Sequence, residues 1–129
     1  MVLQRLPWHG PKPAVLDAMH AADGLTAAAP LLVETCSVRD DDLFQLVSLF
    51  PSRRMIIDPT YGDVRRTSEA SIVEILFLTG RTVDQKSRLF HAIAERAVRA
   101  AFEGDDIMIT LTENAANDWS LGFGRAFRE

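Results

Sequence analysis

The stretch FLTGRTVDQKSRLFHAIAERAVRAAFEGDDIMITLTENAANDWSLGFG, residues Phe77 to Gly124, decides the fold of this chain. From Val83 to Phe102 its apolar residues recur at helical spacing, which predicts an amphipathic helix. Thr82, followed three residues later by Gln85, matches a capping box at the start of that helix, and Gly104 is the expected stop. The polar side of this helix is predicted to carry two ion pairs whose members are four residues apart. They are Asp84 with Arg88 and Glu95 with Arg99.

Strands are predicted on both sides of this helix. Ser71 to Thr79 (SIVEILFLT) is typical of a largely buried strand, and Asp105-Asp106 form an acidic turn that opens a second strand running to Thr112. Parallel strands need a crossover, and a helix between two strands supplies one. The second half of the chain therefore predicts a βαβ unit.

The first half shows the same order. Val2 to Trp8 is a predicted strand, Lys12 to Thr35 an Ala/Leu-rich helical region, and Leu43 to Phe50 a return strand after Asp41-Asp42. Gly24 and Pro30 interrupt the helical pattern, which predicts a kink or two short helices. Two βαβ repeats give an α/β (α+β) fold with a four-stranded sheet and both helices on one face.

We expect a single domain over residues 1–129. Its first repeat covers about 1–50, a linker with a short hairpin at Met55 to Ile57 covers about 51–70, and the second repeat with a C-terminal tail covers about 71–129. The alternating apolar residues of the two later strands also give the sheet a second apolar face. A chain of this size must bury that face against another copy, so composition predicts an oligomer.

Composition narrows the class of protein. The 129 residues carry a formal net charge of −4, which argues against nucleic acid as a partner because phosphate binding needs a basic face. Prolines and charges interrupt the N-terminal residues, so neither a signal peptide nor a membrane span is predicted. Cys36 is the single cysteine and cannot form an internal disulfide, which favours a reducing, cytoplasmic setting.

Three motifs resemble the tautomerase superfamily, in the branch that contains malonate semialdehyde decarboxylase. They are GRTVDQK from Gly80, the Asp105-Asp106 turn, and ENAANDWSLGFG from Glu113. The resemblance implies a homotrimer whose sheets pack together, with active sites between neighbouring subunits and no cofactor. It also implies a small oxo or enol carboxylate as the ligand.

Val2 stands where the resemblance implies the family's catalytic proline, directly after the initiator Met. The secondary amine of such a proline acts as a general acid or base. If Met1 stays on the chain, Val2 offers an amide without basicity. If Met1 is removed, a primary α-amine with a pKa of about 7.7–8.0 takes that place.

Arg81 matches the second arginine of the decarboxylase pattern Arg-Pro-Arg, which implies that its guanidinium binds a substrate carboxylate. By spacing alone, Arg81 is equally compatible with an exposed turn arginine before a helix. Thr79 stands where the pattern has its first arginine, so Thr-Gly-Arg departs from the decarboxylase and is similar to other members of the branch.

Asp42 aligns with an aspartate that positions water in the decarboxylase, although Asp40-Asp41-Asp42 is also compatible with a solvated acidic turn. Trp119 matches a tryptophan of the decarboxylase pocket wall, and an indole in a Gly-flanked tail is equally typical of an interface anchor. The glycines around Ser120 predict a tight tail that reaches a neighbouring subunit.

No metal site or reactive thiol is indicated. His9, His20 and His91 are too scattered to share a metal ion, and His91 is spaced to pair with Glu95 on a helix surface. Two functions remain. The first is a tautomerase-superfamily enzyme without the proline, with weak or altered isomerase- or lyase-type activity. The alternative is a non-catalytic trimer that binds a small acid or a partner protein.

Overall fold

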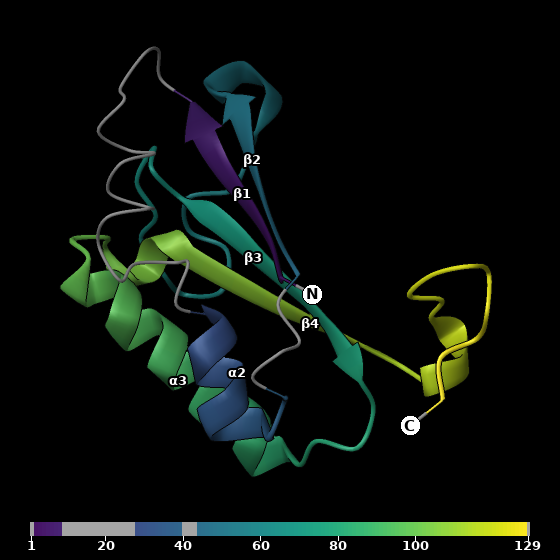
Figure 1. The fold of residues 1–129 in the computed structure, drawn as a ribbon. Coiled ribbons are helices and arrows are strands. Elements are labelled where there is room, and N and C mark those ends of the chain that lie inside the picture. The colour runs from purple at the N-terminus through teal and green to yellow at the C-terminus, as the bar shows by residue number, and fades with distance from the viewer. Residues whose placement is uncertain (1, 9–27, 40–43, 129) are drawn as a thin grey trace.

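The computed structural model describes residues 2–8, 28–39 and 44–128, and these form four strands and two helices with short 3-10 turns between them (Figure 1). In chain order they are β1 (Val2–Trp8), α2 (Ala28–Cys36), β2 (Gln45–Pro51), β3 (Ser71–Leu78), α3 (Val83–Arg99) and β4 (Ile107–Asn114).

The sheet consists of two parallel pairs joined in the middle. Its strand order is β2-β1-β3-β4, with β1 parallel to β2, β3 parallel to β4, and β1 antiparallel to β3. In the central pairing Val2 lies opposite Ile75, and Arg5 lies opposite Ile72. Each parallel pair has a helix between its strands in the chain, so the two predicted βαβ repeats are confirmed.

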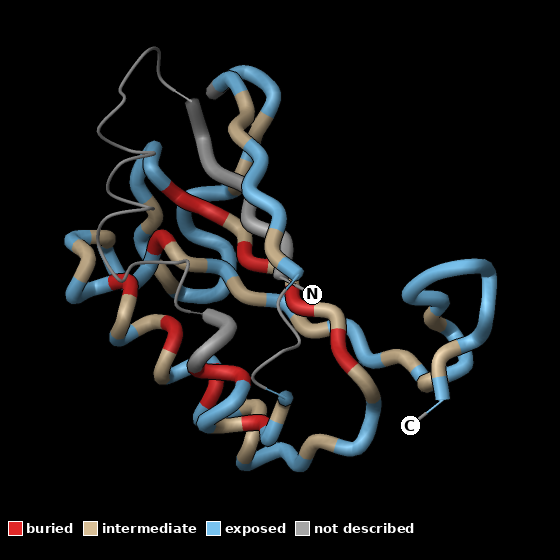
Figure 2. Tube along the Cα trace, in the orientation of Figure 1, coloured by how far each residue is buried: buried red, intermediate tan, exposed pale blue. Residues whose placement is uncertain are grey.

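Both helices pack on one face of the sheet, and the core lies between them (Figures 1 and 2). Every second residue of β3 is buried, and Val73 and Ile75 are 0% exposed. The core residues come from β3 and both helices: Leu31, Leu32, Cys36, Val73, Ile75, Phe77, Leu89, Ile93 and Ala97. Burying these side chains supplies most of the driving force for folding.

The other residues of β3 and its neighbours form what we call the open face of the sheet. In the structure this face carries apolar side chains that the helices do not cover, since Leu46 is 57% exposed and Met108 is 37% exposed. Ile72 lies in register with Met108 and is half-buried. The expected second apolar face is therefore present.

Helix α3 begins where the capping box predicts. The Thr82 hydroxyl accepts a hydrogen bond from the backbone N–H of Gln85 at 3.2 Å, and the Gln85 side chain accepts one from the backbone N–H of Thr82 at 2.9 Å. The helix ends before the predicted Gly104. Ala101 adopts a φ of 67°, and the N–H of Phe102 turns back to the carbonyl of Ala97 at 3.0 Å. This left-handed turn closes the last carbonyls without a glycine.

Two expectations for the first half need correction. Strand β2 begins at Gln45 and ends at Pro51, two residues after the predicted start and one beyond the predicted end. The hairpin at Met55 to Ile57 was wrong, because the structure has no strand there and Ile56 is 91% exposed. The turn that follows is closed by Asp58, whose carboxylate accepts from two backbone N–H groups.

The described part of the predicted helical region is α2, which ends at Cys36, and residues 12–27 with Gly24 lie outside the described residues. Pro30 lies in the first turn of α2. Backbone N–H groups there have no partner within the helix, so the missing N–H of proline costs no hydrogen bond. A membrane-spanning helix, one both long and apolar enough, does not occur in the described part of the chain.

Candidate functional site

The C-terminal ends of β3 and β4 meet the N-terminus of α3 at one corner of the sheet, which we call the exit edge (residues 78–86 and 113–114). The N–H of Thr79 donates to the carbonyl of Asn114 at 2.9 Å and so continues the ladder beyond β3. Gly80 then turns the chain with a φ of 114°, a conformation that L side chains rarely adopt. Val2 begins β1 opposite Ile75, so the start of β1 lies beside the second half of β3.

Arg81 follows the turn, and the structure holds its guanidinium against backbone carbonyls. Its Nε donates to the carbonyl of Cys36 at 3.2 Å, and its Nη1 donates to the carbonyl of Leu78 at 2.5 Å. The guanidinium carbon also lies 5.4 Å from the centre of the Phe77 ring. Arg81 is therefore half-buried and not an exposed turn arginine. Its side chain joins the ends of α2 and β3, and we call this arrangement the clasp.

A guanidinium has five N–H donors, so these two contacts leave donors for a further acceptor. Holding the side chain in one conformation in advance also reduces the entropy lost when a carboxylate binds. The geometry of Arg81 is thus compatible with both a structural role and a ligand role.

Lys86 and Glu113 add an ion pair to the exit edge, which the sequence analysis missed. The Lys86 Nζ lies 2.8 Å from the Glu113 Oε2, and their side chains are 29% and 28% exposed. Lys86 is in the first turn of α3 and Glu113 is the second-last residue of β4, so the pair joins two elements. The partners are 27 residues apart in sequence, a separation that no helix or strand periodicity relates.

The Glu113 carboxyl has a pKa below its usual value. The main cause is its hydrogen bond with Lys86; burial opposes the shift, and a hydrogen bond from the backbone N–H of Arg81 and the Arg81 charge add to it. Glu113 is therefore ionised near neutral pH and is unsuited to donate a proton. Glu113 therefore interacts with both Lys86 and Arg81, and the three charged residues form one group at the exit edge.

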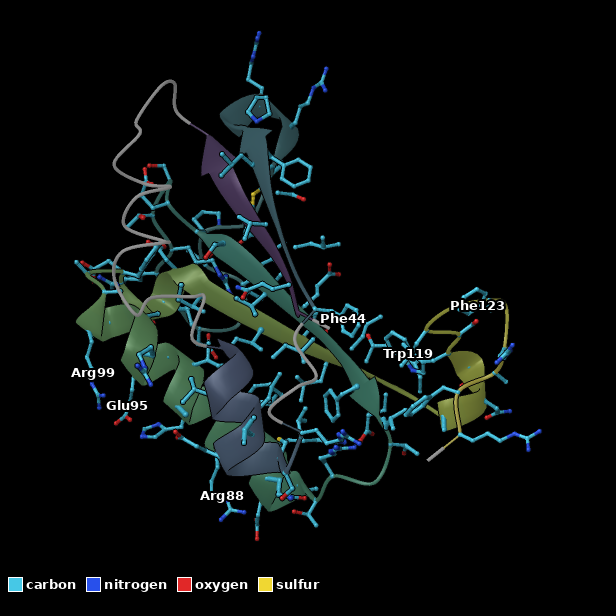
Figure 3. The ribbon with its side chains drawn as sticks, viewed as in Figure 1. Phe44, Arg88, Glu95, Arg99, Trp119 and Phe123 are labelled. Carbon is cyan, nitrogen blue, oxygen red and sulfur yellow. The ribbon has the colours of Figure 1, made fainter. Side chains whose placement is uncertain are left out.

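Trp119 lies at the base of the C-terminal tail, which projects away from the body of the chain (Figures 1 and 3). Its backbone carbonyl accepts from the N–H of Phe127 at 2.7 Å, which folds the tail back on itself. Its indole Nε1 is buried, and within the described residues it has no hydrogen-bond partner. The Oδ1 of Asn114, at the end of β4, is in the same state. A donor and an acceptor near the tail thus lack partners within the described chain.

The tip of the tail is apolar and exposed, since Phe123 is 96% exposed and Leu121 is 60% exposed. Gly124 has a φ of 64°, as the predicted tight tail requires. The other residue in a left-handed conformation there is Phe123, at 54°, and not Gly122.

The remaining predicted site residues fall into two groups. Asp42, with Asp40 and Asp41, lies outside the described residues, and of Val2 only the backbone position is described. His91 pairs with Glu95 at 3.3 Å on the surface of α3, as predicted, and His9 and His20 lie outside the described residues. Among the described residues, no three His, Cys, Asp or Glu side chains are grouped to hold a metal ion.

The opposite corner, which we call the start edge (residues 65–71 and 104–107), also carries acidic residues. Asp106 is 1% exposed, and its carboxylate accepts from the backbone N–H of Thr67 at 2.6 Å and from the Thr67 hydroxyl at 2.5 Å. Its exposed neighbour Asp105 accepts from the backbone N–H of Arg65 at 2.8 Å. The turn that precedes β4 therefore holds residues 65–67 of the loop before β3 in place.

The comparisons with known proteins agree with this fold. The family model described as "Tautomerase enzyme" matches residues 34–122. "Probable tautomerase YusQ" of Bacillus subtilis (strain 168) is 33% identical over 96 residues, which cover 74% of this chain and 76% of that protein. The chain belongs to the tautomerase family.

Two solved structures illustrate the likeness. A malonate semialdehyde decarboxylase inhibited by 3-bromopropiolate superposes with a TM-score of 0.79 at 28% identity, covering 98% of this chain and 92% of that one. A symmetric trimer of wild-type fused 4-OT has a TM-score of 0.72 at 18% identity, covering 97% and 94%, and shows the shared fold.

Proposed function

We propose that this protein acts on small oxo or enol carboxylates, with Arg81 binding the carboxylate and without the family's N-terminal proline. The observation that carries the proposal is the clasped guanidinium of Arg81. It is half-buried, its two contacts among the described residues use two of its five N–H donors, and it lies at the exit edge, where β3 ends. The names of the relatives, a probable tautomerase and a malonate semialdehyde decarboxylase, support the same substrate class.

The reaction class is isomerase- or lyase-type chemistry that needs no cofactor. In ketonisation of an enol acid, the enol oxygen loses a proton as a C–H bond forms at the adjacent carbon, so proton transfer is all that the protein must provide. If Met1 is removed, the α-amine of Val2 can carry that proton at neutral pH, because an α-amine has a pKa of about 7.7–8.0. Asp42 would position water, and Trp119 would form a wall of the site.

The proposal includes a homotrimer with sites between subunits. The open face of the sheet and the tip of the tail expose apolar side chains, and another copy of the chain would cover both. The trimeric fused 4-OT shares the fold. Light scattering should give a mass of about three times 14.3 kDa, and a folded monomer at micromolar concentration would contradict this part of the proposal.

The ligand role of Arg81 is tested by calorimetric titration with a small oxo acid. Wild type should bind, Arg81→Ala should lose binding, and Arg88→Ala should bind like wild type, because Arg88 is an exposed arginine on the polar side of α3 (Figure 3). Equal binding by Arg81→Ala and wild type would assign Arg81 a structural role alone.

A non-catalytic trimer that binds a small acid is the second candidate, and Val2 at the position of the proline is the observation that favours it. Val2→Pro separates the two functions. With Met1 removed, as checked by mass spectrometry, this variant should ketonise an enol acid at least about tenfold faster than wild type, since a positioned base contributes ~10²–10⁴-fold. No gain, with binding at Arg81 intact, would favour the binding protein.

A further inference from the structure

The exit edge contains more charge than the binding of one carboxylate requires. Arg81 precedes the N-cap of α3, Lys86 lies one turn later, and Glu113 reaches Lys86 from β4 at 2.8 Å. The N-terminus of α3 adds a partial positive charge to the same corner. With Glu113 ionised, two cations and one anion leave these three side chains with a single net positive charge.

We propose that Glu113 sets the charge class of the ligand at Arg81: by neutralising Lys86, it makes the site select a monocarboxylate over a dicarboxylate. This inference rests on the proposed function. In this inference Glu113 is a specificity-determining residue, and it acts on the ligand by neutralising the charge of Lys86.

The contacts of Glu113 support this role. Its carboxylate lies close enough to Arg81 to interact with both the backbone N–H and the charge of that residue. A ligand carboxylate bound at the exit edge therefore meets a fixed negative charge that already interacts with Arg81, and a second carboxylate on the ligand adds to that repulsion. The Lys86 and Glu113 side chains are 29% and 28% exposed, so water screens these charges in part.

The alternative role of the pair is a structural tie between α3 and β4. Ion pairs that water reaches contribute little to folding, so a purely structural role predicts small effects on stability and none on the choice of ligand. The preference between two ligands of different charge therefore separates the roles.

The test uses 2-oxopentanoate and 2-oxoglutarate, which share a five-carbon 2-oxo acid chain and differ by one carboxylate. In Glu113→Gln, the ratio of their dissociation constants should shift toward the dicarboxylate by about tenfold relative to wild type, as removal of one nearby charge predicts. Glutamine keeps the size of the side chain and an oxygen acceptor for the N–H of Arg81.

Glu95→Gln is the matched control. It makes the same chemical change and the same change in net charge, but Glu95 pairs with His91 and Arg99 on the outer surface of α3 (Figure 3). Its ratio of dissociation constants should equal that of wild type. Lys86→Gln should shift the ratio toward the monocarboxylate, and the double variant of Lys86 and Glu113 should return it to within about twofold of wild type.

The outcomes are distinct. Binding of both acids with a ratio that changes less than twofold in Glu113→Gln overturns this inference and leaves the proposed function standing. An equal shift in Glu95→Gln also overturns it, because the effect then comes from overall charge. If neither acid binds to wild type or to any variant, the proposed function falls and this inference falls with it.

Discussion

The two corners of the β3–β4 pair use carboxylates in opposite ways. At the start edge, Asp106 is 1% exposed and its oxygens are bound by the backbone and hydroxyl of Thr67. At the exit edge, Glu113 shares a partly exposed corner with two cations, Lys86 and Arg81. Asp106 directly precedes β4, and Glu113 is the second-last residue of that strand. The difference shows that burial and satisfied hydrogen bonds, rather than residue type, separate a carboxylate that holds the fold from one that can influence a ligand.

The largest expected effect is at the start edge. Asp106→Ala removes both bonds to Thr67 and leaves a partly buried backbone N–H without its acceptor, so we expect the free energy of unfolding to fall by about 2–3 kcal/mol. Urea unfolding followed by circular dichroism measures it. Asp105→Ala is the control, since Asp105 is exposed and accepts one backbone hydrogen bond among the described residues, and it should lose less than about 1 kcal/mol. Equal losses would remove the contrast between buried and exposed carboxylates.

An intermediate effect on stability is expected from the clasp. Arg81→Ala removes the bonds to the carbonyls of Cys36 and Leu78, which water can partly replace, so the free energy of unfolding should fall by about 1 kcal/mol. Arg88→Ala should stay within about 0.5 kcal/mol of wild type in the same urea titration. A loss as large as that of Asp106→Ala would mean that the exit edge, too, is mainly structural.

The smallest expected effect is the pH dependence that Glu113 contributes. Its pKa in the folded chain is lowered below the usual value of a glutamate carboxyl, so the ion pair stabilises the fold above that usual pKa and stops doing so as the pH falls through the lowered pKa. Wild type should therefore lose slightly more stability than Glu113→Gln between pH 6 and pH 3. Parallel thermal melts test this. A larger acid loss in the variant would contradict the assigned direction.

Sequence patterns predicted the second repeat better than the first. The start of β3, the start of α3 and the start of β4 follow from alternation, a capping box and an acidic turn, all of which are local signals. The ends are less exact, since β3 ends at Leu78, one residue before the predicted Thr79, and β4 ends at Asn114, two residues beyond the predicted Thr112. The early end of α3 was not predictable, because the left-handed turn is formed by Ala101, a residue that rarely adopts it. The hairpin at Met55 to Ile57 was predicted from apolar residues that the structure leaves without a strand partner.

The candidate site was only partly predictable for a related reason. Family resemblance selected Arg81 and Trp119, but no sequence signal shows that the guanidinium meets the carbonyl of Cys36, 45 residues away. The Lys86–Glu113 pair likewise depends on how α3 crosses β4. Such contacts are set by tertiary packing, which neither spacing nor propensity encodes.

The antiparallel pairing of β1 with β3 has a consequence for how the chain tolerates being cut. Each parallel pair lies wholly within one half of the chain, and the exposed segment around Ile56 joins the halves. A protease that cleaves there breaks no hydrogen bond between strands. The two fragments keep complementary edges and a shared core, so they are suited to reassemble as a heterodimer, much as two separate genes for such halves would encode one protein.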